Sequence, residues 1–228
     1  MSDPYLASKR AAGRAAAELV RPGMRVGLGT GSTFVFVLER LAERIREDGL
    51  EFVGVPTSED TAKRAKDLGV CLVTLDEVTA LDLTIDGADE IDGSKTMIKG
   101  GGGALVREKI VAAAALEMVV VVSANKLVEV LGSTFKLPVE VLTFGWRQAA
   151  ARIESLGLAV QRRMRKDGGA FVSDNGNLIL DCALPPALDP RQLELTLNAI
   201  PGVVDCGLFV GLAGRVFVGD LNGGIRMI

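Results

Sequence analysis

The feature that most constrains the fold is the alternation of short apolar runs with amphipathic segments over the first 123 residues. The apolar runs predict strands at residues 24–28, 52–55, 70–75, 81–85, 97–98 and 118–123. The intervening segments 34–47, 58–68 and 104–115 carry apolar residues at helical spacing, and an Ala-rich helix with Asp3 as its N-cap is expected from Pro4 to about Val20. Strands that alternate with helices predict an α/β fold, a mainly parallel, Rossmann-like sheet with helices on both faces.

The order of elements changes after Leu131. Strands are expected at 137–142, 158–164, 177–182 and 203–210, with helices at 146–156 and 190–200. This β-α-β-β-α-β order is the split βαβ pattern of a ferredoxin-like α+β domain. We therefore expect a Rossmann-like catalytic domain formed by residues 1–131 and 207–228, with an inserted ferredoxin-like domain at 132–206. The last strand, 216–219, is expected to return to the first domain.

Charge and apolar content exclude several classes of protein. The net charge is −3, and no block of Lys and Arg is long enough to indicate nucleic-acid binding. The longest apolar run, Met118–Val122, is too short to span a bilayer. The N-terminus lacks the layout of a signal peptide, and Cys71, Cys182 and Cys206 are scattered in apolar surroundings. These features predict a cytoplasmic protein with reduced cysteines in its core.

The chain contains no histidine. Histidine is the usual proton carrier near neutral pH and a common metal ligand, so acid–base chemistry must fall to carboxylates, Lys, Tyr or Cys. No pair of cysteines has the spacing of metal ligands. We therefore expect no transition-metal site.

A glycine-rich loop, GLGTGST at 27–33, lies between a predicted strand and a predicted helix. Glycines let the backbone approach an anion, and the N–H groups at the helix start point toward it. Thr30, Ser32 and Thr33 add hydroxyl donors. The loop matches neither the dinucleotide fingerprint nor the Walker loop. The alternative is a tight turn with a helix cap.

Two further loops carry charged groups beside glycines. DGADE at 86–90 places three carboxylates directly after a strand, where open α/β sheets bind ligands; the alternative is a solvated acidic turn. KGGGGAL at 99–105 places Lys99 at the entrance of four consecutive glycines, where its charge can stabilise a developing oxyanion; the alternative is a flexible hinge.

The charged trio Arg107-Glu108-Lys109 follows the glycines early in a predicted helix. Helical spacing places Glu108 on the face opposite part of the Leu105–Val106 stretch. Such a trio is usually a solvated helix face, but the neighbouring glycine loop favours a role for the glutamate. An anion loop, clustered carboxylates and a cation suit a proton shift beside a carbonyl on a phosphorylated substrate.

The four motifs GTGST, DGADE, KGGGGAL and REK, in this order, resemble the type A ribose-5-phosphate isomerases. LPVEV at 137–141, VSDNGN at 172–177 and NAIPGVV at 198–204 resemble the second domain of the same family, so the resemblance spans nearly the whole chain. It implies the cofactor-free aldose–ketose interconversion of D-ribose 5-phosphate and D-ribulose 5-phosphate, in the non-oxidative branch of the pentose phosphate pathway. It also implies a homodimer or higher homo-oligomer.

The resemblance assigns roles residue by residue. Glu108 would be the proton acceptor, Asp86 and Asp89 would assist ring opening and proton movement between the oxygens, and Lys99 would stabilise the enediolate. Which aspartate performs which step stays open. The residues expected to hold substrate are Lys9, Thr30, Gly31, Ser32, Thr33, Asp86, Gly87, Ala88, Asp89, Lys99, Gly100, Gly101, Gly102 and Lys126.

Two other functions fit parts of the pattern. A sugar-phosphate-sensing domain of a transcription regulator would share the general fold, but it would need a DNA-binding module. A relative of acyl-CoA transferases would use a glutamate nucleophile, which DGADE and the four glycines disfavour. A purely structural role is disfavoured by four ligand-binding loops in one chain.

Overall fold

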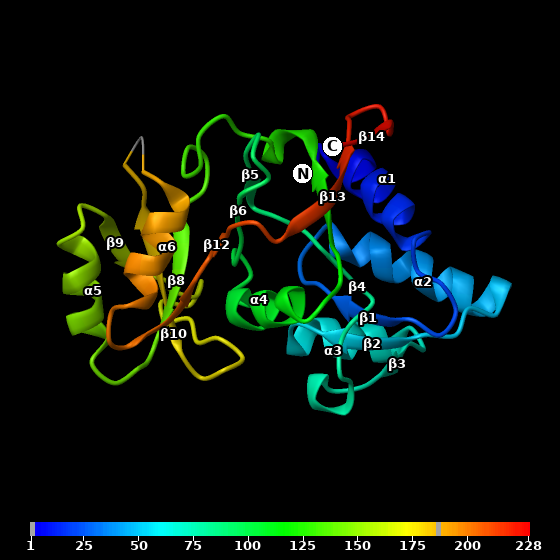
Figure 1. Cartoon of the computed structure of the whole chain (residues 1–228), viewed down its shortest axis with the longest axis horizontal. Coiled ribbons are helices and arrows are strands. Elements are labelled where there is room, and N and C mark those ends of the chain that lie inside the picture. Colours follow the sequence, from blue (N-terminus) through cyan, green and yellow to red (C-terminus); the bar gives the residue numbers. More distant parts are fainter. Residues whose placement is uncertain (1–2, 186–187) are drawn as a thin grey trace. The chain divides into compact units, whose positions relative to one another are not determined.

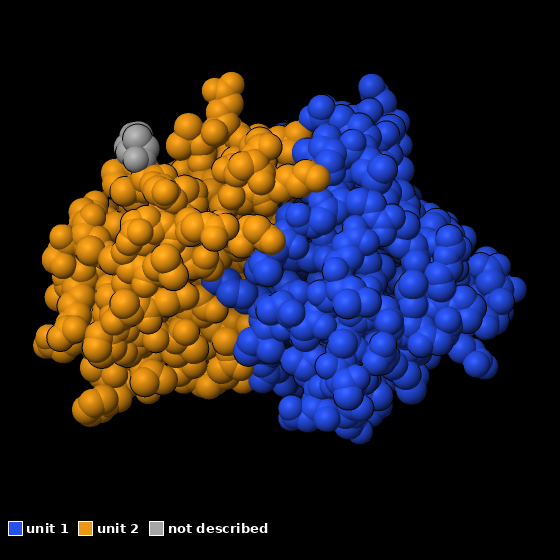
Figure 2. Space-filling view, viewed as in Figure 1, with its two compact units in different colours: residues 1–88, 107–126, 212–228 blue, residues 89–106, 127–211 orange. Residues whose placement is uncertain are grey.

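The computed structural model describes residues 3–185 and 188–228, which form two compact units (Figure 2). Unit 1 comprises residues 1–88, 107–126 and 212–228, and unit 2 comprises residues 89–106 and 127–211. The segment 89–106 thus belongs to the same compact unit as residues 127–211. The predicted domain boundaries, at residues 131/132 and 206/207, stay a prediction.

Unit 1 is built on a seven-stranded sheet in the order β14-β13-β7-β4-β1-β2-β3 (Figure 1). Its strands are β1 (Arg25–Leu28), β2 (Val53–Pro56), β3 (Cys71–Leu72), β4 (Leu83–Asp86), β7 (Met118–Ser123), β13 (Ala213–Gly219) and β14 (Ile225–Met227). The pairings from β13 to β3 are parallel, and β14 pairs antiparallel with β13. The predicted mainly parallel sheet and the return of the last predicted strand to it are both confirmed.

Helices cover both faces of this sheet. They are α1 (Leu6–Ala17), α2 (Phe34–Asp48), α3 (Glu59–Asp67) and α4 (Leu105–Ala113), with the short 3₁₀ helices η1 (Leu75–Glu77) and η2 (Ala124–Lys126). Apolar residues of α1 and α2 pack with Val26 and Leu28 of β1 in one core cluster. Val111 of α4 packs with Val55 and Leu81 in a separate cluster. The central strands β4 and β7 are buried along their whole length, as expected of parallel strands covered on both faces.

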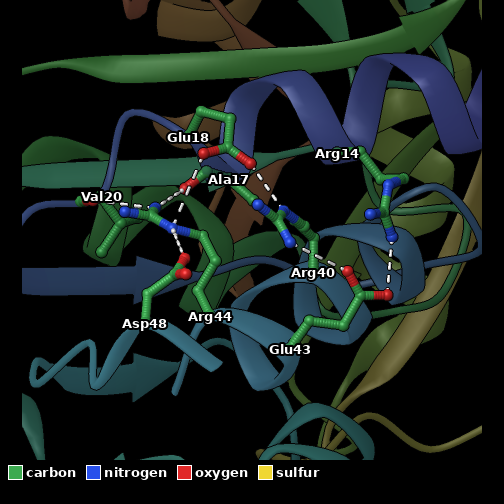
Figure 3. Close-up of polar contacts among 8 residues, drawn as sticks. All are labelled: Arg14, Ala17, Glu18, Val20, Arg40, Glu43, Arg44 and Asp48. Carbon is green, nitrogen blue, oxygen red and sulfur yellow. Dashed lines mark hydrogen bonds and ion pairs between the residues drawn. The ribbon is translucent and has the colours of Figure 1, made fainter. Parts of the chain in front are cut away.

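Arg44 of α2 fixes the end of α1. Its Nη1 donates to the carbonyl oxygens of Ala17 and Val20 at 2.6 and 2.9 Å (Figure 3). The N–H groups of Glu18, Leu19 and Val20 donate to carbonyls three residues earlier, so α1 closes in a tighter turn after Ala17, and Arg44 gives the Val20 carbonyl a donor. The helix begins at Leu6 with Tyr5 as its N-cap, so the prediction of Asp3 as the N-cap was wrong, although the Asp3 carboxylate accepts from the N–H of Tyr5.

Unit 2 contains a four-stranded antiparallel sheet in the order β11-β8-β10-β9. Its elements are β8 (Leu137–Val141), α5 (Trp146–Glu154), β9 (Ala159–Arg162), β10 (Leu178–Ala183), α6 (Pro190–Asn198) and β11 (Val203–Cys206). Apolar residues of both helices join one cluster with those of the sheet. The order and the pairing confirm the predicted ferredoxin-like part. A small antiparallel sheet, β12 (Leu208–Phe209), β6 (Met97–Ile98) and β5 (Glu90–Ile91), completes the unit.

The predicted strands 203–210 and 70–75 differ most from the structure. The predicted strand 203–210 is divided at Gly207 into β11 and β12, because that glycine lies against the backbone of Lys99 and Pro138, where a Cβ atom would overlap the Lys99 carbonyl oxygen. The predicted strand 70–75 ends at Leu72. Glu77 accepts from the N–H and hydroxyl of Thr74 at 2.6 and 2.8 Å, which starts a turn instead.

The cysteines divide into two environments. Cys182 and Cys206 are buried as predicted, and burial raises the pKa of the Cys182 thiol to about 12. Cys71 is exposed on the edge strand β3, so its prediction as a core residue was wrong. Across residues 3–185 and 188–228, none of the helices combines the length and apolarity that crossing a bilayer requires.

Candidate active site

In unit 1 the predicted motifs follow three neighbouring parallel strands. β4 pairs with β1 on one side and with β7 on the other. The loop with Thr30 follows β1, Gly87 and Ala88 follow β4, and Lys126 ends the 3₁₀ helix after β7. The carboxyl ends of parallel strands share one edge of the sheet, and open α/β sheets bind ligands at this edge. The topology therefore gathers these predicted site residues at one edge.

Asp86 links two of the predicted motifs. Its side chain is buried, and Oδ1 accepts from the N–H of Thr30 at 3.0 Å and from that of Gly87 at 2.7 Å. A Cβ atom at Gly29 would overlap the same carboxylate. The glycine is therefore needed for this close approach, and the aspartate does not belong to a solvated acidic turn.

The hydroxyl of Thr30 belongs to a cluster of hydroxyl groups that the sequence did not reveal. Its Oγ1 bonds Thr57 Oγ1 and Ser58 Oγ at 2.8 Å each, and Thr61 Oγ1 donates to the carbonyl of Gly29 at 2.8 Å. From the sequence, Ser58 was predicted only as the first residue of the helix 58–68, and in the structure it is the N-cap of α3. These hydroxyl groups hold the backbone of the predicted anion loop at Gly29 and Thr30. The Thr30 side chain therefore helps to fix the conformation of the loop.

The loop at 31–33 combines a helix start with a lysine. Gly31 has a positive φ of 111°, which glycine adopts at little cost. Lys9 Nζ donates to Ser32 Oγ at 2.9 Å and pairs with Asp3 at 2.7 Å. The hydrogen bond that Lys9 donates to the Asp3 carboxylate is the main cause of the lowered pKa of Asp3. The structure thus brings Lys9 to the predicted anion loop, after which α2 begins; the N–H groups of Val35 and Phe36 in its first turn donate to the carbonyls of Gly31 and Thr33 at 3.3 and 3.2 Å.

Glu108 is the buried member of its charged trio. It is 5% exposed, whereas Arg107 and Lys109 are partly exposed, and Arg107 pairs with Glu59 at 2.8 Å. Glu108 shares its buried face with Leu105, one turn earlier, and does not share a face with the partly exposed Val106, which agrees with the expected placement opposite part of this stretch. A glutamate is rarely buried without a specific role, so α4 does not simply present a solvated charged face here.

In unit 2 the glycine loop approaches Asp89. The N–H of Gly101 donates to Asp89 Oδ2 at 2.7 Å, and a Cβ atom at Gly101 would lie 2.6 Å from Oδ1. Gly100 has a positive φ of 103°, and Gly102 is exposed. The glycines therefore permit a close contact between backbone and carboxylate, which a flexible hinge would not require.

Lys99 is buried at the end of β6. Its N–H donates to the carbonyl of Gly207 at 2.8 Å, and its Nζ lies 5.4 Å from the centre of the Phe209 ring. An aromatic face attracts an ammonium group at this distance. Both the backbone and the side chain of Lys99 are therefore fixed by contacts with the segment 207–209.

Glu90, the third carboxylate of DGADE, has a different partner set. It is fully buried and accepts from the N–H groups of Gly132, Thr134 and Phe135 and from the Thr134 hydroxyl, at 2.5 to 2.8 Å. These bonds anchor the loop before β8. Glu90 is therefore a structural carboxylate, although its sequence position resembles that of the two aspartates.

One group of side chains in unit 2 has a geometry compatible with a metal ion. Glu194, Asp205 and Cys206 each place one possible ligand atom within 4.8 Å of the others. Asp205 Oδ1 already accepts from the N–H of Cys206 at 2.7 Å and from Asn198 at 3.2 Å. A carboxylate pair beside a thiol is not by itself a metal site, and we assign no ion to it.

The fold and these side chains define an α/β enzyme that moves protons on an anionic substrate. The family model of Ribose 5-phosphate isomerase A (phosphoriboisomerase A) matches residues 53–223. The ribose-5-phosphate isomerase A of Gloeobacter violaceus is 53% identical over 221 residues, which cover 96% of this chain and 95% of that protein.

Solved structures agree with these sequence matches. The ribose 5-phosphate isomerase A of Methanocaldococcus jannaschii superposes with a TM-score of 0.92 at 38% identity, covering 96% of this chain and 97% of its own. A D-ribose-5-phosphate isomerase in complex with phospho-erythronic acid gives a TM-score of 0.94 at 33% identity, covering 100% and 99%.

The chain therefore belongs to the ribose-5-phosphate isomerase A family, as its four motifs predicted. It isomerises ribose 5-phosphate in the pentose phosphate pathway, and its substrate is a sugar phosphate. Neither the regulator domain nor the acyl-CoA transferase considered above is the family that these comparisons identify.

Proposed function

We propose that the isomerisation proceeds through an enediolate, with Glu108 as the base. The carboxylate takes the proton from C2 of the open-chain aldose and returns a proton to C1, while the C1 carbonyl becomes a hydroxyl and the C2 hydroxyl becomes a carbonyl. No atom is gained or lost overall. The observation that carries this proposal is the burial of Glu108 between two more exposed charged neighbours, in a chain without histidine.

We assign the oxygen-bound protons to Asp86 and Asp89. One of them assists opening of the sugar ring, and one moves a proton between O1 and O2. Both carboxylates already accept backbone N–H bonds, Asp86 in unit 1 and Asp89 in unit 2. Lys99 supplies positive charge for the enediolate oxygen, because a fixed cation stabilises negative charge that develops in the transition state.

The loop at 30–33 and Lys9 bind the phosphate in this proposal. The N-terminus of α2, the Ser32 and Thr33 hydroxyls and the Lys9 ammonium all favour an anion. Lys126 contacts the substrate beyond β7, and Gly31, Gly87, Ala88 and the glycines at 100–102 line it with backbone. A relative solved with phospho-erythronic acid supports a phosphorylated ligand.

We further propose a metal-independent, cytoplasmic enzyme that acts as a homodimer or higher homo-oligomer. The lack of histidine and of paired cysteines supports metal independence, and activity should survive exhaustive chelation. The ferredoxin-like residues 132–206, which we retain as the inserted domain beside 1–131 and 207–228, serve assembly. A monomer at micromolar concentration by light scattering would contradict the assembly proposal.

The base is tested by Glu108→Gln, which keeps the shape of the side chain and removes its basicity. General-base catalysis contributes about 10²–10⁴-fold, so kcat should fall by that order. KM should change little, because the lost interaction belongs to the transition state. Glu47→Gln, at an exposed position of α2, is the matched control. Normal turnover of Glu108→Gln would move the base to another residue.

A further inference from the structure

Arg163, directly after β9, contacts the glycine loop of unit 2. Its Nη1 donates to the carbonyl oxygens of Gly100 at 2.9 Å and Gly101 at 3.0 Å. The other side of the guanidinium pairs with Asp181, from Nε at 3.0 Å and from Nη2. The Arg163 side chain is only 13% exposed. One planar group thus binds a carboxylate and two loop carbonyls at once.

The bond to Gly100 matters because of the peptide unit to which that carbonyl belongs. The C=O of Gly100 and the N–H of Gly101 form one planar peptide, and in the trans form they point in opposite directions. Arg163 holds the oxygen of this peptide, and Asp89 Oδ2 accepts from its N–H at 2.7 Å. Arg163 and Asp89 therefore bind opposite ends of the same peptide unit.

Glycine gives this peptide freedom that must be restrained. A residue with a Cβ atom at position 100 would clash with Leu105, and one at position 101 would clash with Asp89. Glycine at both positions permits many backbone conformations, including a rotation of the peptide plane that would turn the N–H of Gly101 away from Asp89. The charge-assisted hydrogen bond from Arg163 to the Gly100 carbonyl opposes that rotation, because the rotation would break it, and the bond to the Gly101 carbonyl holds the next peptide unit.

The hairpin that carries Arg163 is itself well anchored. The N–H of Arg163 donates to Ile179 at 2.8 Å, and its carbonyl accepts from Phe171 at 3.0 Å. The Phe171 ring fills the space where a Cβ atom of Gly103 would lie. In the next turn, residues 173–177, the side chains of Ser173, Asn175 and Asn177 donate to the buried Glu140 at 2.9, 3.0 and 2.9 Å.

We propose that Arg163 is a positioning residue for Asp89. By fixing the Gly100–Gly101 peptide, it orients the N–H that holds the Asp89 carboxylate, and Asp181 holds the guanidinium in turn. This inference rests on the proposed catalytic role of Asp89. In this proposal Arg163 acts on Asp89 through the Gly100–Gly101 peptide and does not itself contact the substrate.

The test compares Arg163→Gln with Arg165→Gln. Arg165 lies on the same hairpin, is largely exposed and pairs with Asp167 at 3.1 Å. A small misplacement of a catalytic group costs on the order of 10²-fold in rate, so Arg163→Gln should lower kcat by up to that factor with little change in KM. Arg165→Gln should behave as the wild type. Equal turnover of the two variants would overturn the proposal.

A double-mutant cycle separates positioning from general loss of structure. If Arg163 acts through Asp89, Arg163→Gln should have little further effect in an Asp89→Asn background, measured at high enzyme concentration. An equal decrease in both backgrounds would show that Arg163 does not act through Asp89. Normal turnover of Asp89→Asn alone would instead refute the proposed role of Asp89.

Two variants keep the test valid if Arg163→Gln does not fold. Arg163→Lys keeps the charge but cannot bind Asp181 and both carbonyls with one planar group, and it carries the same cycle. Asp181→Asn leaves Arg163 in place and should lower kcat less than the Arg163 variants do. Wild-type kcat in both variants would overturn the proposal.

Discussion

Two sets of carboxylates, one from each unit, are held in different ways, although Asp86 of unit 1 and Asp181 of unit 2 each follow the pattern of the other set. In unit 1, Glu43, Asp82 and Glu117 accept from arginines of other segments, at partly exposed positions. In unit 2, Glu90 and Glu140 are fully buried and accept from neutral amide and hydroxyl groups. Exposed ion pairs are screened by water and contribute little, whereas buried donors that lose their acceptor cost much more. The same residue type therefore has unequal importance in the two units.

The α1–α2 contact illustrates the arrangement in unit 1. Glu43 accepts from Arg14 at 2.7 Å and from Arg40 at 3.1 Å (Figure 3). Hydrogen bonds from Arg14 and then Arg40 lower the pKa of Glu43 from 4.5 to about 2. The contact joins the helix that carries Lys9 to the helix that follows the anion loop, so charge pairing supports the proposed phosphate site.

The largest effect should come from Glu90→Ala in unit 2. The substitution leaves the N–H groups of Gly132, Thr134 and Phe135 without their acceptor, and each unsatisfied buried donor costs about 1–3 kcal/mol. We expect a loss of about 3 kcal/mol or more in the free energy of unfolding. Hydrogen exchange of β8 and β10 measures it, with the exposed Glu129→Ala as control. Equal protection in the two variants would remove the contrast between the units.

A smaller effect is expected from Glu117→Gln in unit 1. Glu117 binds Arg215 through two bonds of 2.7 Å, but both side chains are partly exposed. Pairs of this kind contribute about 1 kcal/mol or less, so the urea midpoint should move only slightly. A loss as large as that of Glu90→Ala would show that exposure does not govern the difference.

The smallest effect concerns pH in unit 1. A carboxylate with a lowered pKa stabilises the folded state fully above its unfolded pKa, and this contribution is lost as pH falls through the folded pKa. For Glu43 the window therefore runs from about pH 4.5 down to about pH 2, and the pKa values of Asp82 and Glu117 are lowered in the same direction. The difference in stability between wild type and Glu43→Gln should shrink across this window, and a constant difference would contradict it.

Local signals predicted much of the fold. The strand Met118–Ser123 was predicted with its observed bounds, since an apolar run has few other interpretations in an α/β chain. The helix predicted at 190–200 begins at Pro190 as expected, and Asp189 caps it by accepting from the N–H groups of Arg191 and Gln192. Such features depend on neighbours within a few residues, so the sequence alone contains the information.

Features that depend on distant partners were not predicted. Glu90 resembles Asp86 and Asp89 in sequence, and its structural role follows from donors 42 to 45 residues later. The interruption at Gly207 did have a local signal, because a glycine within a strand pattern often marks close backbone approach.

The predicted site was incomplete for the same reason. The sequence indicated the loops that bear the charged groups, but not the groups that hold those loops. The hydroxyls of Thr57 and Thr61 and the guanidinium of Arg163 come from other segments. Their residue types are common on protein surfaces and in caps, so no motif distinguishes them.

The central claim, that Glu108 moves the carbon-bound proton, is tested most directly by solvent exchange. Wild-type enzyme and Glu108→Gln are incubated with ribose 5-phosphate in deuterated buffer, and deuterium at C2 is followed by NMR. The account predicts that exchange and ketose formation are lost together in Glu108→Gln, while the Glu47→Gln control retains both. Exchange at the wild-type rate in Glu108→Gln would contradict the account, because another group would then remove the C2 proton.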